Sequence, residues 1–155
     1  MHHVSIRTAD IHRAIAFYEL LGFSVIERFT TGYTLACWLA GVHGRIELIQ
    51  IPEPHPTADA FNDEHYTGYY HLSFDLTEHA ASLPAWLADL AARFASQAQE
   101  PESPIQPLKV LLPPTQQMIG SKVYEVTFIA DSDGLPLEFI RCLTLTDATT
   151  QDTSE

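Results

Sequence analysis

The sequence predicts an α+β fold made of two βαβββ modules whose sheets curl towards each other. The stretches HHVSIRT at residues 2–8 and YHLSFDL at residues 70–76 both alternate apolar and polar residues, as strands do. Each is followed by an amphipathic helical pattern and then by further strand patterns. Because each half has only one helix for three or four strands, the pattern argues against a doubly wound parallel sheet.

The elements of the first module follow from its periodicity and its capping residues. The period-two strand at residues 2–8 places Val4 and Ile6 on one face. Asp10 is a suitable N-cap for the helix that follows, and Gly22 is a suitable C-cap. We expect the remaining strands of this module at residues 23–31, 33–40 and 45–51.

The second module repeats the pattern with a longer insertion. A strand at 70–76 precedes a helix at 80–98 that carries an apolar stripe at helical spacing. A Pro-rich connector follows. We then expect a short strand at 108–112, a loop at 113–120 and strands at 122–130 and 135–142.

These elements predict one domain over residues 1–145. Module one spans residues 1–52, a linker spans 53–68 and module two spans 69–145. The stretch from Pro52 to Gly68 contains three prolines and shows no apolar period, as a linker does. The last residues, 146–155, are polar and acidic, so we expect a flexible tail.

Composition limits the classes of function. An apolar content of 46% suffices for a packed core, whereas a formal net charge of −12 leaves too few cations to neutralise phosphates. Nucleic acid and anionic membrane surfaces are therefore not expected partners. Cys37 and Cys142 lie in apolar strand patterns, as reduced core thiols do. With no leader pattern and no stretch long enough to cross a bilayer, we expect a cytoplasmic protein.

Four side chains of metal-ligating type occupy matching places in the two halves. His3 and His71 stand at the head of each module, while Glu47 and Glu138 lie inside apolar strands near each module's end. A carboxylate among apolar neighbours is costly unless a partner compensates its charge. A divalent cation can do so and can recruit neutral imidazoles as further ligands. The pattern therefore predicts that these four side chains converge on one cation in a shared cleft.

Other interpretations of these residues need no metal. A single strand histidine is usually a hydrogen-bonded core or surface group, and each acid has an arginine nearby in sequence. The candidate ion pairs are Glu47 with Arg45 and Glu138 with Arg141. His2 competes with His3 as a ligand, but strand alternation is expected to turn the two to opposite faces. The match of His-Val-Ser with His-Leu-Ser favours His3.

The segments around these residues resemble the vicinal oxygen chelate superfamily, which comprises glyoxalases, bleomycin-resistance proteins and extradiol dioxygenases. The similar segments are HHVSIRTADIHRAIAFYELLGF, RIELIQ, YHLSFDL and DSDGLPLEFI, and together they extend over most of the chain. The resemblance implies a glyoxalase-like fold, in which two βαβββ modules with curled mixed sheets form a cup around a metal. It also implies a homodimer, and it places the metal ligands at His3, Glu47, His71 and Glu138.

Two histidines and two glutamates resemble the ligand set of glyoxalase I. The resemblance implies one divalent ion (Ni, Co, Zn, Mn or Fe) and a lyase or isomerase acting on a small vicinal-oxygen substrate, such as an α-ketoaldehyde adduct. The reaction would pass through an enediolate, with Glu47 or Glu138 carrying the proton. One alternative is an Fe(II) extradiol ring-cleaving dioxygenase, which would leave Glu47 unused. Another is a non-catalytic drug-binding and resistance protein.

Arg7 lies four residues after the first histidine and matches a family arginine that contacts the glutathione carboxylate. Two further glutathione contacts of the family have no match, because the chain reads IQIP and YTGY where an Asn and an Arg would stand. The use of glutathione therefore stays open. Arg7 is a candidate substrate-binding residue, and the alternative is an ion pair with Asp10 or Glu138.

Overall fold

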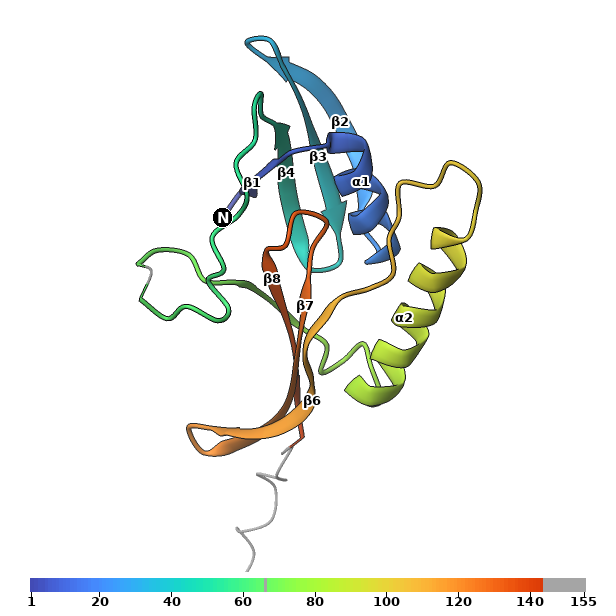
Figure 1. Cartoon of the computed structure of the whole chain (residues 1–155). Helices are drawn as coiled ribbons and strands as arrows, with labels where there is room; N and C mark the ends of the chain where they lie inside the picture. The colour runs from blue at the N-terminus through green and yellow to red at the C-terminus, as the bar shows by residue number, and fades with distance from the viewer. Residues whose placement is uncertain (66, 144–155) are drawn as a thin grey trace, which may run out of the picture.

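The chain folds into two modules with the same order of elements (Figure 1). The computed structural model describes residues 1–65 and 67–143, so the tail expected at 146–155 lies outside the described part of the chain. The elements of module one are β1 (Val4–Thr8), α1 (Ile11–Leu20), β2 (Ser24–Thr31), β3 (Thr34–Gly41) and β4 (Gly44–Gln50). Those of module two are β5 (Leu72–Asp75), α2 (Leu83–Ala98), β6 (Val110–Ile119), β7 (Lys122–Ala130) and β8 (Pro136–Cys142).

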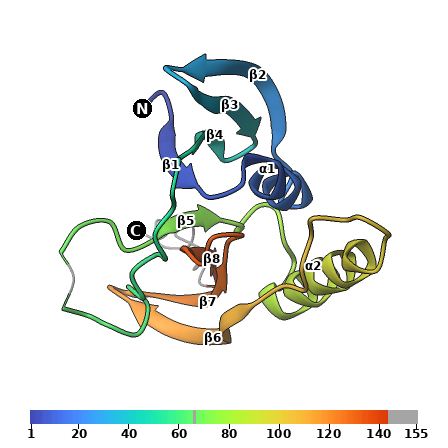
Figure 2. The same ribbon diagram turned by 45° about the horizontal axis from the view of Figure 1, so that its top comes forward.

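Each module contains one four-stranded mixed sheet. The strand orders are β1-β4-β3-β2 and β5-β8-β7-β6, so the two topologies are identical. In each sheet the first strand runs parallel to the last, and the other pairs are antiparallel. The predicted α+β fold of two βαβββ modules is therefore confirmed. Both helices lie on the same side of the molecule (Figures 1 and 2).

The helices begin where their capping residues place them. The carboxylate of Asp10 accepts the N–H groups of His12 and Arg13, which fixes the start of α1 as expected. The predicted start of α2 at residue 80 is wrong, because Ser82 caps the helix and accepts the N–H of Ala85. Within the described ranges, neither helix is long and apolar enough to cross a membrane.

The largest difference from the predicted elements concerns β6. We expected a strand at 108–112 and a loop at 113–120, but one strand runs from Val110 to Ile119. β6 is an edge strand, and its pairing with β7 is irregular between Leu112 and Thr115. The two prolines at 113–114 fall in this irregular stretch, where the lack of a backbone N–H is tolerated. Proline therefore marked a bulge and not the end of the strand.

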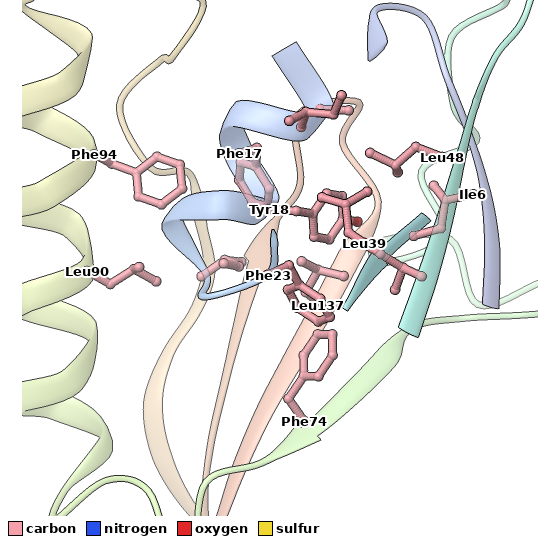
Figure 3. Packing of buried hydrophobic residues seen from close by; sticks show 14 of the residues in the cluster. Ile6, Phe17, Tyr18, Phe23, Leu39, Leu48, Phe74, Leu90, Phe94 and Leu137 are labelled. Atoms are coloured by element: carbon pink, nitrogen blue, oxygen red, sulfur yellow. The ribbon is translucent and has the colours of Figure 1, made fainter. Parts of the chain in front are cut away.

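One hydrophobic core extends through both modules (Figure 3). Phe17 of α1 packs against Phe94 of α2 with ring centroids 5.1 Å apart. Phe23 of module one lies 6.0 Å from Phe74 of β5. Because these aromatic side chains are nearly fully buried, separating the modules would expose a large apolar area.

Polar contacts also join the modules. In the turn between β7 and β8, Asp131 accepts a hydrogen bond of 2.9 Å from the buried Tyr18 hydroxyl. Asp133 accepts from the Thr8 hydroxyl and from Arg13 Nη2 at 3.0 Å. Burial is the main cause that raises the pKa of the Asp131 carboxyl above its ordinary value. Since this turn binds β1 and α1, the position of β8 relative to module one is fixed.

Candidate metal centre

Strand register explains why one imidazole meets one carboxylate in each module. In both modules a histidine stands two residues before a serine, and that serine is the cross-strand partner of a glutamate. Each histidine directly precedes its strand, and its ring lies next to the carboxylate of that glutamate. The distances are 3.5 Å from His3 Nε2 to Glu47 Oε2 and 3.3 Å from His71 Nε2 to Glu138 Oε2.

The four predicted ligands form two pairs within a single chain and do not form one group. The described residues contain no cluster of three or more His, Cys, Asp or Glu side chains that could hold a metal. The physical reason is topological, because β1 and β4 belong to one sheet whereas β5 and β8 belong to the other. Each module thus presents a half-site of one imidazole and one carboxylate.

In the half-site of module one, hydrogen bonds hold the Glu47 carboxylate in place. Trp38 is the cross-strand partner of Glu47, and its indole Nε1 donates a 3.0 Å hydrogen bond to Glu47 Oε1. Partial burial raises the pKa of the Glu47 carboxyl, but hydrogen bonds from Ser5 and Trp38 and the nearby imidazoles lower it more. The pKa of Glu47 therefore lies below its ordinary value. Its second oxygen, Oε2, faces His3.

His2 belongs to the same half-site, contrary to the expectation that His2 and His3 turn to opposite faces. Its Nδ1 lies 2.8 Å from His3 Nδ1, because β1 begins only at Val4 and alternation does not apply before it. Arg45 Nη1 lies 2.7 Å from His2 Nε2. A guanidinium only donates, so His2 Nε2 accepts and His2 carries its proton on Nδ1. The proton of a neutral His3 then lies on Nε2, which faces Glu47.

Aromatic rings surround the half-site of module two. Phe128 is the cross-strand partner of Glu138, and its ring lies 5.0 Å from that of His71. Tyr70 and Phe61 extend the aromatic wall, with ring centroids 4.6 Å from His71 and 5.4 Å from Phe128 respectively. Burial, and then the negative charge of Glu138, raise the pKa of the Tyr70 hydroxyl. Nδ1 of His71 is buried and has no hydrogen-bond partner among the described residues.

The structure does not support the ion pairs considered as alternatives. Arg45 contacts His2, and Arg141 contacts Glu125 Oε2 at 3.4 Å and the carbonyl of residue 80. Arg7 is exposed on β1 and forms no ion pair with any other residue that the structure describes. Asp10, its proposed partner, caps α1. Each site glutamate instead pairs with an imidazole.

This repeated arrangement agrees with the comparison with known protein families. A family profile described as the glyoxalase/bleomycin resistance protein/dioxygenase superfamily matches residues 2–106 of the chain. The chain belongs to this superfamily. No curated protein matches the chain significantly.

Solved structures of the glyoxalase superfamily share the fold. A glyoxalase family protein from Enterococcus faecalis superposes with a TM-score of 0.64 at 22% identity, covering 91% of this chain and 96% of that chain. A glyoxylase/bleomycin resistance protein/dioxygenase domain from Frankia sp. gives 0.62 at 18% identity, covering 92% and 96% respectively. A glyoxalase I mutant from Zea mays gives 0.62 at 18% identity, covering 91% of this chain and 44% of that one.

Around the half-site of module one, the sequence analysis of this glyoxalase superfamily member did not connect Trp38 with Glu47. It also set His2 aside in favour of His3 and considered Arg45 only as a partner of Glu47, whereas Arg45 contacts His2. A signal for Trp38 was available, because Gly41 and Gly44 flank a two-residue hairpin turn. Counting outward from that turn places Trp38 directly opposite Glu47. For His2, the signal would have been a later start of the strand, which the alternating pattern did not reveal.

Proposed function

We propose that this protein is a metal-dependent lyase or isomerase of the glyoxalase type that acts on a small vicinal-oxygen substrate. The observation that carries the proposal is the equivalent His–Glu pair in the two modules, formed by the same register of parallel strands. Two matched pairs are what a shared cation site would need.

The donor set fits one divalent ion of the group Ni, Co, Zn, Mn and Fe. Imidazole nitrogen and carboxylate oxygen together suit these ions, and the four side chains are only partly buried, so an ion can reach them. A bound ion would supply a Lewis acid that polarises the vicinal oxygens of the substrate. A bound ion would occupy His3 Nε2, so the proton of the neutral ring would have to lie on Nδ1, and the contact between His3 Nδ1 and His2 Nδ1 would have to rearrange.

We propose further that a homodimer completes the site. Since one chain presents two separate half-sites, a two-fold dimer can bring the His3–Glu47 pair of one chain to the His71–Glu138 pair of the other. The symmetry then creates two equivalent sites in each dimer. The other partner is the small-molecule substrate. We also propose that the protein acts in the cytoplasm.

The two glutamates have different surroundings and so suit different roles. Glu47 is held by Trp38 and Ser5, which fits a ligand that stays in place. The polar contact of Glu138 is with His71, so fewer hydrogen bonds hold Glu138 in place than hold Glu47. We assign Glu138 as the base that takes a proton from the hydroxyl-bearing carbon and returns it to the adjacent carbon. Arg7 is a candidate for holding an anionic part of the substrate.

The decisive experiment combines elemental analysis with two assays. Purified protein is expected to hold about one metal ion per chain, and to isomerise a hemithioacetal of an α-ketoaldehyde without taking up oxygen. Oxygen uptake with a catechol and ferrous iron would instead identify a ring-cleaving dioxygenase. Failure to bind any of the five metals, together with retained binding of a small drug, would identify a non-catalytic binding protein.

Substitution of Trp38 by Phe tests whether Glu47 is held by its neighbour. A smaller aromatic ring remains, and the N–H donor to Glu47 Oε1 is lost. Since partners that orient a ligand typically contribute 10- to 100-fold to metal affinity, we expect affinity to fall by about tenfold. Calorimetric titration with Ni²⁺ measures the change. Phe29→Leu is the matched control, because Phe29 packs on Trp38 with centroids 5.2 Å apart and donates nothing to Glu47.

A further inference from the structure

A cavity of about 260 Å³ lies where the two modules meet, beside the His3–Glu47 half-site. Residues before and within β1, the β3–β4 turn and the start of β5 line it, including His3 itself. A separate cavity of about 200 Å³, lined by Arg13, Phe17 and Phe94, is not lined by any of the paired site residues. Only the first of these cavities can therefore present a ligand to the half-site of module one.

The residues that line this cavity differ in charge from the chain as a whole. The full sequence has 20 acidic residues against 8 Lys and Arg. Nevertheless, none of the described residues that line the cavity carries a carboxylate. Its basic lining residues are His2, His3, His43 and Arg45. With the cation of Arg45 on its wall and no acidic lining residue, the cavity suits an anion better than the acidic remainder of the chain does.

Arg45 is the group on this wall that can hold an anion. Its guanidinium contacts His2 Nε2 at 2.7 Å and lies 5.6 Å from the centre of the Trp38 ring, and neither group neutralises its charge. The nearest site carboxylate, Glu47, is engaged by Trp38 and His3. No acid among the described residues forms an ion pair with Arg45. A guanidinium with free donors matches the two oxygens of a carboxylate.

The rest of the wall indicates what the anion carries. Phe23 and Phe74 line the cavity with ring centroids 6.0 Å apart, and the His43 ring lies 5.6 Å from that of Phe74. An inorganic anion held by Arg45 would lose hydration against these rings and gain nothing from contact with them. An apolar body attached to a carboxylate would instead gain from burial. We propose that this cavity binds a small organic carboxylate, with the carboxylate on Arg45 and its apolar body on Phe23 and Phe74.

Calorimetry with benzoate tests the site directly. The protein is first freed of metal by dialysis, so the result does not depend on the proposed metal centre. We expect benzoate to bind, and benzyl alcohol, which has the same ring without the charge, to bind at least about tenfold more weakly. Inorganic phosphate serves as the second comparison. Equal binding of benzyl alcohol, or tighter binding of phosphate, would overturn the proposal.

Two substitutions assign the binding to Arg45. Arg45→Gln should weaken benzoate binding by about tenfold or more, and Arg45→Lys, which keeps the charge but not the paired donors, should have an intermediate effect. Arg28→Gln removes an exposed arginine of β2 that does not line the cavity, and it should leave binding unchanged. Thermal unfolding checks that each variant is folded. Unchanged benzoate affinity in folded Arg45→Gln would exclude the site.

Discussion

Substitution of Glu138 by Gln is expected to lower kcat/KM for the isomerisation by about three orders of magnitude. The side chain keeps its size, so the packing around Phe128 and His71 should be preserved. What is lost is the ability to accept and return a proton. Steady-state kinetics with a hemithioacetal measures the loss, and elemental analysis of the same sample shows whether the variant still holds metal. Retained metal with lost activity would identify the proton carrier.

Two further variants test whether the loss of activity is specific to Glu138. Glu27→Gln changes an exposed glutamate of β2 that lies outside both half-sites, and activity should stay within about twofold of the parent. Glu47→Gln removes a ligand that Trp38 holds in place, so we expect a larger loss of metal affinity than in Glu138→Gln. If Glu138→Gln turned over substrate at the parental rate, the assignment of Glu138 as the base would be wrong.

Much of the fold follows from local patterns in the sequence. The alternation in the strands, the cap at Asp10 and the repeat of His-x-Ser predicted two equivalent modules, and the structure has identical strand orders in both. These features involve neighbours within one module, where periodicity carries the information. The sequence placed each histidine and glutamate in matching strand patterns but did not predict that they pair, because a period of two determines the face of a residue and not the register between two strands.

The features that escaped prediction depend on contacts that periodicity does not record. The pair of prolines at 113–114 suggested a loop, whereas the edge position of β6 lets the strand continue through a bulge. The four ligands were expected to meet in one cleft, but sequence symmetry does not determine how two sheets are placed relative to each other. The cavity between the modules, lined by His43 and Arg45, arises from that placement and has no local signature.

Mixing two inactive variants tests where the metal site is assembled. His3→Ala removes a ligand from the half-site of module one, and His71→Ala removes one from the half-site of module two. Each variant alone should be inactive and deficient in metal. If each site combines half-sites from two chains, a mixed dimer contains one intact site and one site lacking both histidines. After subunit exchange in an equimolar mixture, we expect about a quarter of the parental activity, because half of the dimers are mixed and each has one intact site.

The control pairs two variants of the same half-site, His3→Ala with Glu47→Ala. In their mixed dimer every site has one defective half-site from module one, so no activity should return. Recovery in the first mixture and none in the second can arise only from a site shared between chains, since a site within one chain would be defective in every molecule of both mixtures. If the subunits are shown to exchange and the first mixture still regains no activity, the half-sites of two chains do not combine into one site. That result would exclude the proposed dimeric centre.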